Sequence, residues 1–381
     1  MVKIKPKKSV SRKRKRIGVK TEMKSYKNLY AKINKEMVLK AIKDASKGGK
    51  KKRRTDTQKA LENPEEYAEI ILADLACFKN DKHTPKEIYD GISRKKRTII
   101  VPTFREQVVH HLIVDVLKPF FLQGIYECAY GSIPKRGVHD AKKKIERWIR
   151  TDYKNCKYVL KMDIRKYFEC IPHDVLKAKL QRQIADKEIL RILFEIIGAT
   201  DKGLPLGFYT SQWLSMWYLM GFDHYIKEQC RATHYIRYMD DLVVFEADKE
   251  NLHLIKHRAE QYLYFLGLKL NQKTQIFPLE KRDLDFMGFR FYPNKTTLRR
   301  GIYYKMLRKA KKLAYRKPTI YEMRQMLSYL GWIKACDIYN VYLLYIKPFI
   351  DFGKYKQRMS NYDRRMNHVV LLRSNNAACS D

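Results

Sequence analysis

The sequence predicts an α+β protein of 381 residues, in which short antiparallel strands lie among longer helices. Two β-prone apolar runs, residues 235–238 and 242–245, flank Met239-Asp240-Asp241, which is typical of a hairpin with two carboxylates at its tip. A second apolar run, residues 158–162, also ends in a carboxylate, Asp163. Apolar residues at helical spacing fill much of the chain around these strands.

The two adjacent carboxylates need a reason, because acidic residues are depleted in strands. For a lone Asp-Asp pair, an ordinary polar turn would be the simpler explanation. A pair on a rigid turn can also ligate Mg²⁺, which prefers hard oxygen ligands. Asp163 favours the metal site, because two-metal phosphoryl transfer needs carboxylates from separate strands around ions roughly 4 Å apart. One ion activates the attacking 3′-hydroxyl and the other steadies the leaving pyrophosphate, and Asp163 and Asp240 are the predicted pair.

The residues around these carboxylates resemble the reverse transcriptases. Asp163 with Phe168, and the segment Tyr238-Met239-Asp240-Asp241, are similar to the palm of that family. Further motifs follow the family's order: a fingers strand at residues 97–102, the motifs before and after the catalytic hairpin at 203–212 and 267–274, a primer grip at 284–289 and the start of a thumb at 328–332. The similarity covers roughly residues 26–350. It implies a right-hand polymerase fold with fingers, a palm of antiparallel sheet plus helices, and a helical thumb.

This resemblance divides the chain into segments. They are a basic N-terminal extension with a first helix (1–60), the fingers (61–156), the palm (157–298, with a helical fingers–palm insertion at about 174–202), the thumb (299–352) and a C-terminal tail (353–381). Little room follows the thumb, so no RNase H, integrase or endonuclease domain is expected.

The charge of the chain predicts a polyanionic partner. Lys and Arg number 80 against 41 Asp and Glu, a formal net charge of +39. An imbalance this large destabilises the folded chain through self-repulsion. A soluble surface alone does not need so large an excess of positive charge. Nucleic acid is therefore the expected partner, with a membrane surface as the alternative. No stretch approaches the length of a membrane-spanning helix, and no signal peptide is visible.

The seven cysteines are spread irregularly and none forms a CxxC pair. Zinc and a disulfide framework are therefore not expected, and the chain fits a reducing cytoplasm. Neither a Walker A loop nor a GxGxxG fingerprint is present.

The N-terminal part combines basic clusters with two helices. Residues 1–25 form a basic tail that is expected to be disordered when free. Apolar residues recur at helical spacing over residues 26–47, and Gly48-Gly49 ends that helix. The cluster at 50–54 is either a solvated turn or a backbone contact, and the total charge favours contact. Residues 64–78 predict another helix.

The fingers are expected to contain a hairpin and a buried helix. Residues 86–102 predict the hairpin. Residues 108–117 predict a helix that ends before Pro119. Its His110 and His111 are expected to be packed or surface residues, because no carboxylate partner lies at metal-ligand spacing.

Helices are expected on both sides of the catalytic strands. Residues 130–137 form a loop before a helix at 138–149, whose N-terminus could hold a phosphate; a plain loop before a helix fits equally well. Residues 174–199 predict helical material, and the helix from 210 to about 229 carries a core stripe of Trp, Met, Leu and Tyr. Residues 252–266 predict the helix after the hairpin.

The C-terminal part begins with a strand predicted at residues 269–277. From Lys305 on, the chain is helical, basic and rich in tyrosine, which suits contacts with the backbone of a primer–template duplex. Residues 353–381 have weak periodicity and are expected to be a poorly ordered tail.

The resemblance also implies roles for individual residues. The expected catalytic residues are Asp163, Asp240 and Asp241, and the expected metal ligands are these three with Ile164, around two Mg²⁺ ions for which Mn²⁺ can substitute. The nucleotide is expected to meet Arg97, Phe168, Leu206, Gly207 and Lys273. Template RNA and nascent cDNA are expected to meet Lys51, Lys52, Arg53, Arg54, Arg136, Gln212, Lys305 and Arg308.

Three of the nucleotide contacts have a defined chemical role in the family. Arg97 would cover the triphosphate of the incoming dNTP. Phe168 would close the sugar pocket against a 2′-hydroxyl, because steric exclusion needs a rigid, bulky side chain beside the metals. Lys273 would lie near the leaving phosphate and donate a proton to it.

The segment from Leu206-Gly207 to Ser211-Gln212 indicates the subfamily. Most relatives resemble Gln-Gly-x-x-x-Ser-Pro here, whereas the Leu-Gly and Ser-Gln form resembles enzymes of diversity-generating retroelements, within the bacterial and phage group II intron-like family. Such enzymes copy a template-repeat RNA with errors at adenines, and the cDNA replaces a variable repeat in a target gene. Their partner is a small basic helical protein, the accessory variability determinant.

Two alternatives remain open at the level of sequence. The first is another bacterial reverse transcriptase of the retron, group II intron-like or abortive-infection type. The second is a non-catalytic RNA-binding scaffold, which the presence of Asp163, Asp240 and Asp241 disfavours.

Overall fold

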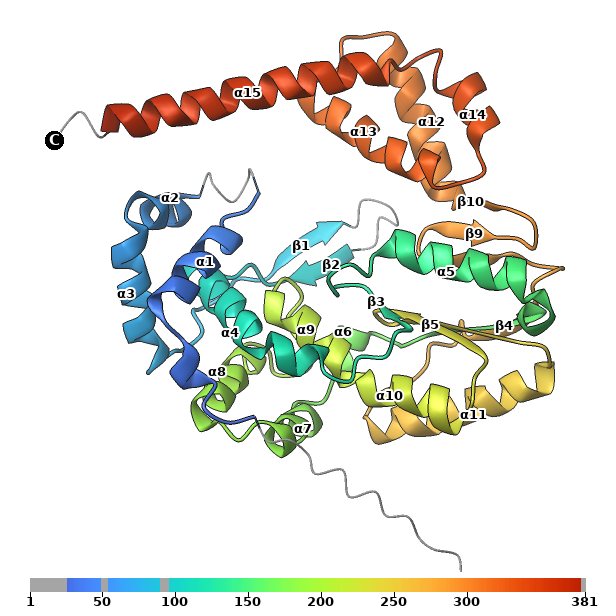
Figure 1. The fold of residues 1–381 in the computed structure, drawn as a ribbon, viewed down its shortest axis with the longest axis horizontal. Helices are drawn as coiled ribbons and strands as arrows, with labels where there is room; N and C mark the ends of the chain where they lie inside the picture. Colours follow the sequence, from blue (N-terminus) through green and yellow to red (C-terminus); the bar gives the residue numbers. More distant parts are fainter. Residues whose placement is uncertain (1–25, 49–53, 90–95, 378–381) are drawn as a thin grey trace, which may run out of the picture.

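The computed structural model describes residues 26–48, 54–89 and 96–377, with side chains up to residue 365. Helices surround a small set of antiparallel strands, so the predicted α+β class is confirmed. Figure 1 shows three regions: helices α1 to α4 and α8 at one end, the main sheet with its helices at the other, and a separate helical layer, α12 to α15, across both. The segment boundaries expected from the resemblance stay a prediction, and the names fingers, palm and thumb are used below for the groups of elements given with each name.

The main sheet forms the centre of the palm. Its order is β3-β5-β6-β4-β7, in which β3 runs parallel to β5 and the other neighbours are antiparallel. The strands are β3 (Ala129–Tyr130), β4 (Tyr158–Asp163), β5 (His234–Tyr238), β6 (Asp241–Glu246) and β7 (Gln275–Pro278). The β5–β6 hairpin and the strand ending at Asp163 are both as predicted.

The sheet separates two hydrophobic cores. On β6, Leu242 and Val244 pack into a core shared with the fingers helices, whereas Val243 and Phe245 pack into a core shared with α5 and the thumb. Successive strand residues point to opposite faces, so Asp241 lies on the same face as Val243, toward the thumb. Burial on both faces explains why these strands read as continuous apolar runs.

Helices cover both faces of this sheet. Figure 1 shows α5 on one side and α10 and α11 on the other. The helical elements of this region are α5 (Val138–Thr151), η3 (Tyr153–Cys156), α6 (Tyr167–Cys170), α7 (His173–Gln183), α8 (Lys187–Ile197), α9 (Tyr209–Tyr218), α10 (Met220–His224), the π-helical turn η4 (Tyr225–Gln229) and α11 (Lys249–Phe265). The prediction of a single helix from 210 to about 229 was wrong, because this segment forms three successive helices, α9, α10 and η4.

The fingers combine helices with an exposed two-stranded ribbon. The elements are η1 (Tyr30–Lys32), α1 (Lys35–Ala45), α2 (Thr55–Glu62), α3 (Pro64–Leu75), β1 (Lys86–Tyr89), β2 (Lys96–Ile99) and α4 (Phe104–Leu122). The predicted end of the third long helix was wrong, because α4 continues through Pro119. Phe120 and Phe121 are 2% and 1% exposed, and their burial offsets the backbone hydrogen bond that proline cannot donate.

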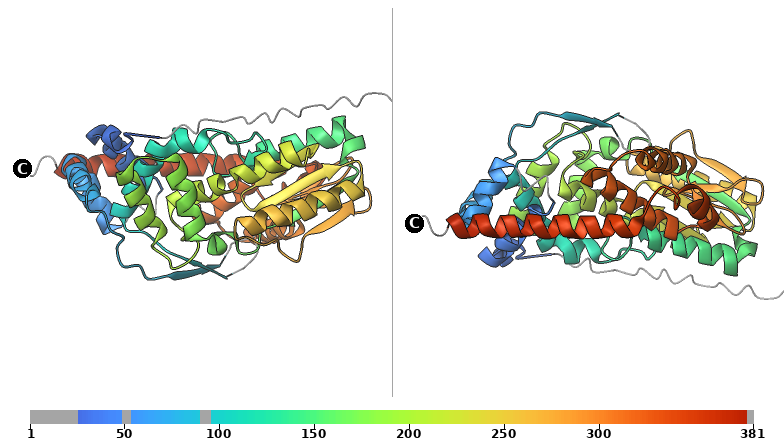
Figure 2. Two further views of the ribbon diagram at one scale, coloured as in Figure 1. Left: turned by 90° about the horizontal axis from the view of Figure 1, so that it is seen from below. Right: turned by 90° about the horizontal axis from the view of Figure 1, so that it is seen from above.

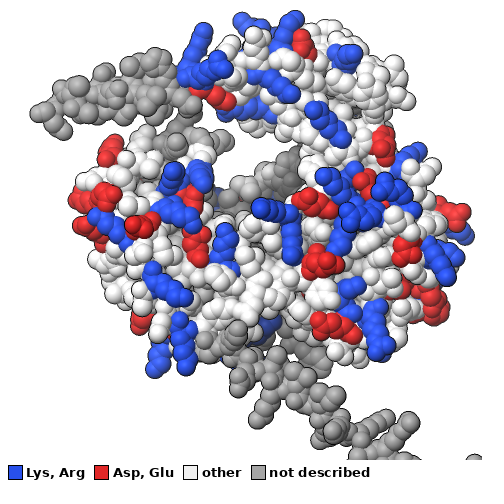
Figure 3. Space-filling view, viewed as in Figure 1, with Lys and Arg blue, Asp and Glu red and all other residues white. Residues whose placement is uncertain are grey.

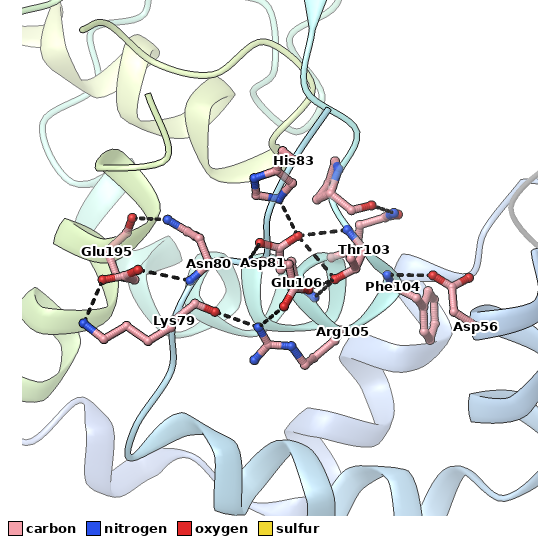
Figure 4. Close-up of polar contacts among 12 residues, drawn as sticks. Asp56, Lys79, Asn80, Asp81, His83, Thr103, Phe104, Arg105, Glu106 and Glu195 are labelled. Carbon is pink, nitrogen blue, oxygen red and sulfur yellow. Dashed lines mark hydrogen bonds and ion pairs between the residues drawn. The ribbon is translucent and has the colours of Figure 1, made fainter. Parts of the chain in front are cut away.

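One buried carboxylate holds both ends of the β1–β2 ribbon. Glu106 of α4 is 0% exposed, and it accepts a hydrogen bond from the backbone N–H of Asp81 (3.0 Å) and lies 2.8 Å from Nε2 of His83. It also accepts hydrogen bonds from the backbone N–H of Thr103 at 2.9 Å and from the hydroxyl of Thr103 at 3.2 Å. Figure 4 shows these groups converging at the start of α4. Because Asp81 precedes β1 and Thr103 follows β2, the ribbon is anchored at its base.

The thumb packs on the palm through a small sheet. The elements are β8 (Leu284–Phe286), β9 (Phe289–Phe291), β10 (Thr296–Leu298), α12 (Arg300–Ala314), α13 (Ile320–Lys334), α14 (Tyr339–Tyr345) and α15 (Phe352–Ala377). The expectation of a poorly ordered tail from residue 353 was wrong for residues up to 377, because they form α15. Phe352, Tyr355 and Met359 are buried at helical spacing, and Figure 2 shows α15 running along the long axis of the molecule.

Two further findings concern membrane-spanning helices and the cysteines. No helix in the described ranges is long and apolar enough to cross a bilayer. The cysteines of those ranges, including the buried Cys128 and Cys156, are free thiols.

Candidate active site

Two of the predicted catalytic carboxylates lie directly opposite each other. In the antiparallel pairing of β4 with β6, the Cα partner of Asp163 is Asp241. Side chains of such a pair share a face, and like charges there are destabilising. The two carboxylates come from separate strands, as two-metal transfer requires. The register therefore places Asp241 beside Asp163, although the sequence favoured Asp240 for this position.

Asp240 lies in the two-residue turn between β5 and β6. Tyr238 pairs with Asp241 in the register, so Met239 and Asp240 form the loop. Met239 has φ +58°, a left-handed conformation that hairpin turns of this length favour but non-glycine residues rarely adopt. The carbonyl of Asp240 accepts a hydrogen bond from the backbone N–H of Ile164 (3.4 Å), which joins the turn to the end of β4.

Burial and neighbouring carboxylates disfavour the charged forms of Asp240 and Asp241. Burial, and then repulsion from Asp241 and Asp163, raises the pKa of Asp240 to about 6. Burial also raises the pKa of Asp241, and the nearby Lys161 opposes that shift. Repulsion of this kind is relieved by a bound cation.

The donor set fits Mg²⁺. No group of three carboxylate, imidazole or thiolate side chains in the described ranges forms a ready-made metal cage. Mg²⁺ does not require one, because it keeps water ligands and binds through one or two carboxylates plus substrate phosphates. Asp163, Asp240 and Asp241 would supply the carboxylates, and Ile164, whose backbone N–H donates to the carbonyl of Asp240, is the residue expected to add a backbone carbonyl.

Asn271 is a site residue that the sequence did not single out. Its Nδ2 donates to Oδ2 of Asp163 at 2.9 Å, and its backbone N–H donates to the carbonyl of Asp163 at 2.7 Å. Asn271 therefore fixes both the side chain and the backbone of that aspartate. It lies within the motif at 267–274, but amide residues in loops are common, and only the fold brings it to Asp163.

A cavity of about 230 Å³ lies beside the catalytic turn. Phe168, Leu206 and Gly207, all predicted to meet the nucleotide, line this cavity together with Tyr238 and Met239. Other residues lining it are Ser132, Pro205, Phe208, Ser211 and Gln212. Phe168, predicted to exclude a 2′-hydroxyl, and Leu206, which indicates the subfamily, thus line the same cavity.

Gly207 is required by the backbone around it. Its φ is +114°, and a Cβ added there would lie 2.1 Å from the carbonyl oxygen of Ile100. Beside it, the backbone N–H of Ile100 donates to the carbonyl of Leu206 at 2.8 Å. The fingers strand and the loop of the cavity are therefore in direct backbone contact.

The other two nucleotide residues differ in their placement. Arg97 lies on β2, and its positive charge lowers the pKa of Asp240, so the structure brings it within electrostatic range of the site. Lys273 is exposed in a turn that starts at Asn271, whose Oδ1 accepts from the backbone N–H of Lys273 at 3.1 Å. The strand predicted at 269–277 was wrong in extent, because only β7 is regular.

Several predicted nucleic-acid contacts are held by the protein itself. Arg54 forms an ion pair with Asp56 (2.5 Å) and donates to the carbonyl of Pro102 (3.2 Å). Arg136 donates to the carbonyl of Tyr126 at 2.8 Å. Lys51, Lys52 and Arg53 lie outside the described residues.

The remaining predicted nucleic-acid contacts lie on α9 and α12. Gln212 is exposed and borders both the small cavity and a second one of about 600 Å³. Arg308 is exposed on α12, and Lys305 on the same helix is half-buried. Figure 3 shows a hollow between the thumb and the rest of this face, with Lys and Arg side chains on both sides of it. That arrangement suits a nucleic-acid backbone.

His110, His111 and the loop before α5 have structural contacts instead of ligand-binding ones. His110 is fully buried, its ring lies 4.5 Å from that of Phe208, and burial lowers its pKa to about 3. His111 stacks on Tyr209 at 4.3 Å, so both histidines are packed, as predicted. At the start of α5, Oδ2 of Asp140 accepts from the backbone N–H at 137 (3.0 Å), which favours a plain capped helix over a phosphate site.

Comparison with known proteins gives a consistent result. A sequence model of the family described as reverse transcriptase (RNA-dependent DNA polymerase) matches residues 79–291, more than half of the chain. The chain is 26% identical over 244 residues to Protein YkfC of Escherichia coli, which covers 51% of this chain and 63% of that protein. It is 24% identical over 169 residues to the retron Ec73 reverse transcriptase of Escherichia coli, with coverages of 40% and 51%.

Two further similarities were found. Nuclear intron maturase 1, mitochondrial, of Arabidopsis thaliana is 26% identical over 117 residues, or 30% of this chain and 16% of that protein. The chain thus spans less than two thirds of each of these relatives. Telomerase from Candida albicans in complex with a fragment of telomeric RNA superposes with a TM-score of 0.45 at 14% identity, covering 78% of this chain and 63% of that one. At that score the likeness supports no statement about substrate or partner.

Proposed function

The chain belongs to the reverse transcriptase family, and from this premise we propose that it copies RNA into DNA by two-metal-ion nucleotidyl transfer. The observation that carries the proposal is the pairing of Asp163 with Asp241 across β4 and β6, with Asp240 in the adjoining turn. When bound, two Mg²⁺ ions would activate the primer 3′-hydroxyl and stabilise the leaving pyrophosphate.

The residues of the chain have distinct tasks in this proposal. Asp163, Asp240 and Asp241 hold the ions, and Asn271 orients Asp163. Phe168 positions the sugar of the incoming dNTP, and Arg97 faces its triphosphate. Orientation of this kind turns a bimolecular reaction into an effectively intramolecular one.

Extension of a DNA primer on an RNA template, with dNTPs and Mg²⁺, tests this activity. A non-catalytic RNA-binding scaffold would bind the primer–template but leave the primer length unchanged. A protein that binds but does not extend, with either Mg²⁺ or Mn²⁺, would support the scaffold instead.

We further propose that the enzyme serves diversity-generating retrohoming. Supporting this is Leu206, where most relatives resemble Gln, in the wall of the cavity beside Phe168. Its partners would be a template-repeat RNA and a small basic accessory variability determinant, in the cytoplasm. The main alternative is a retron or intron-like reverse transcriptase. The similarities to the Ec73 enzyme and the maturase fit this alternative equally well. A near-repeat pair and a small basic open reading frame beside the gene would separate the two.

Leu206→Gln is expected to lower misincorporation opposite template adenine more than opposite other bases. Leucine offers neither a donor nor an acceptor, whereas a site that reads polar groups through hydrogen bonds discriminates strongly. An apolar contact contributes only about 1–3 kcal/mol of discrimination. The measurement is sequencing of cDNA made by both proteins on one defined RNA.

A Leu206→Met variant is the matched control, because it keeps the cavity wall apolar. Equal adenine error rates in active wild-type and Leu206→Gln enzymes would place the source of infidelity elsewhere. The subfamily proposal would then depend on motif resemblance alone.

RNA affinity is expected to fall steeply with salt. A chain of net charge +39 releases many counterions when its Lys and Arg side chains meet phosphates, and each contact adds about 0.7 to the log–log slope for single strands. Replacing the Lys and Arg residues within 1–25 by Gln should lower that slope at constant length. Affinity measured from about 50 to 200 mM salt tests this, and a flat titration would contradict it.

A further inference from the structure

A buried ion pair lies behind the catalytic turn. Nε and Nη2 of Arg237 on β5 donate to Oδ1 and Oδ2 of Asp223 on α10, at 2.7 and 2.5 Å. Both side chains are 1% exposed. The hydroxyl of Tyr235 donates to Oδ1 of the same carboxylate at 2.8 Å. The two residues and Tyr235 form a closed triad within the palm.

The guanidinium also reaches the catalytic turn. Nη1 of Arg237 donates to the carbonyl oxygen of Met239 at 3.0 Å, and Nη2 donates to the carbonyl of Met216 at 3.3 Å. Met239 is the residue with φ +58° immediately before Asp240. A left-handed methionine persists only where its surroundings enforce that conformation, and the Arg237 hydrogen bond is one of those constraints.

Two other contacts hold the same residue. The backbone N–H of Met239 donates to the carbonyl of Tyr130 at 3.2 Å. Its side chain lies against Gly131, where an added Cβ would be 3.0 Å from Cγ of Met239. The N–H and the side chain of Met239 are thus held by the neighbouring residues Tyr130 and Gly131, and its carbonyl is held by Arg237; Asp240 follows directly.

Stability alone is a poor explanation for this pair. Removing two charges from water is costly, and well-packed apolar residues of similar size often serve a fold as well or better. An apolar triad could fill this space, but it could not donate a hydrogen bond to the carbonyl of Met239. That hydrogen bond and the one to the carbonyl of Met216 both require the arginine, and of the two only the first reaches the catalytic turn.

We infer that Arg237 and Asp223 are positioning residues for nucleotidyl transfer. Asp223 fixes the plane of the guanidinium, and the guanidinium holds the left-handed turn that directs Asp240 toward Asp163. The inference goes beyond the proposed function but rests on it, because it assigns a task in metal binding to residues that touch neither metal nor substrate.

The test replaces the triad with apolar residues in the full-length protein. The variant Tyr235→Phe/Asp223→Leu/Arg237→Met leaves neither a buried charge nor a buried hydroxyl unpaired. We expect thermal unfolding close to that of the wild type. We also expect about a 10- to 100-fold loss of Mn²⁺ affinity, measured by electron paramagnetic resonance, and a similar loss of extension rate that extra Mg²⁺ partly restores.

A rescue variant distinguishes positioning from general structure. Glycine adopts positive φ without strain, so Met239→Gly added to the apolar triad should recover part of the Mn²⁺ affinity, relative to Met239→Gly alone. The matched control is His234→Phe at the other end of β5. It removes the 2.8 Å contact with Asp152 and preserves the stacking on Trp148, and it should leave Mn²⁺ affinity unchanged.

The outcomes separate this inference from the proposed function. A wild-type protein that neither binds Mn²⁺ nor extends a primer would refute the function itself. A folded triad variant that matches an active wild type in both measurements would overturn only the positioning role. Should the triad variant not fold, Arg237→Lys is measured instead, because lysine keeps the charge but lacks the planar fork, and wild-type Mn²⁺ affinity would then overturn the inference.

Discussion

Asp240→Asn is expected to abolish primer extension while leaving RNA affinity largely intact. The substitution removes one charge from a site where burial and neighbouring carboxylates raise the pKa of Asp240 and Asp241, and so removes attraction for the ions. Several kcal/mol of transition-state stabilisation would be lost, which is about a thousandfold in rate. Asp163→Asn should act in the same way, because Asp163 faces Asp241 across the sheet.

The measurement compares extension rates and RNA affinities at ordinary Mg²⁺ concentrations. Asp201→Asn, the same chemical change at an exposed loop position, is the control and should behave as the wild type does. Substantial extension by Asp240→Asn would refute the assignment of the catalytic turn. A parallel loss of RNA affinity would show that the substitution disturbs more than the metal site.

Phe168→Ala is expected to admit ribonucleotides. The ring lines the cavity beside the catalytic turn and contacts Tyr167 edge-on at 5.6 Å. The carbonyl of Phe168 accepts from the backbone N–H of Leu204 at 2.7 Å, and Gly203 approaches it so closely that a Cβ would lie 2.4 Å away. Because residues 203 and 204 hold the backbone of Phe168 at its carbonyl, truncation of the side chain should open space for a 2′-hydroxyl instead of moving α6.

The ratio of kcat/KM for a ribonucleotide to that for its deoxynucleotide should rise roughly 10- to 100-fold. Phe265→Ala is the matched control, because that ring is 80% exposed on α11 and lies outside the cavity lining. An unchanged ratio in active Phe168→Ala enzyme would remove Phe168 from the sugar pocket.

The catalytic strands could be predicted because their signals are local. Apolar runs bounded by acidic residues mark β4, β5 and β6, and burial on both faces preserves those runs. The register that sets Asp163 opposite Asp241 is not local, because it depends on how the strands pair. For this reason the sequence favoured Asp240 over Asp241, whereas the structure places both beside Asp163.

Contacts between segments that are distant in the chain could not be predicted from the sequence. Asn271 and Asp223 are ordinary polar residues until the fold brings them to Asp163 and Arg237. The misjudged tail and the helix across Pro119 have a related cause. In both, buried aromatic residues outweigh weak local signals, and that burial exists only in the assembled protein.

The backbone at Leu206 has a consequence for how such an enzyme can evolve. The main chain of residue 206 is secured by its hydrogen bond with Ile100, and residue 207 must be glycine. The side chain at 206, however, projects into a cavity and carries little of the fold. On the role proposed for Leu206, exchanges there would alter copying accuracy while leaving the scaffold intact, so accuracy could change during evolution independently of folding.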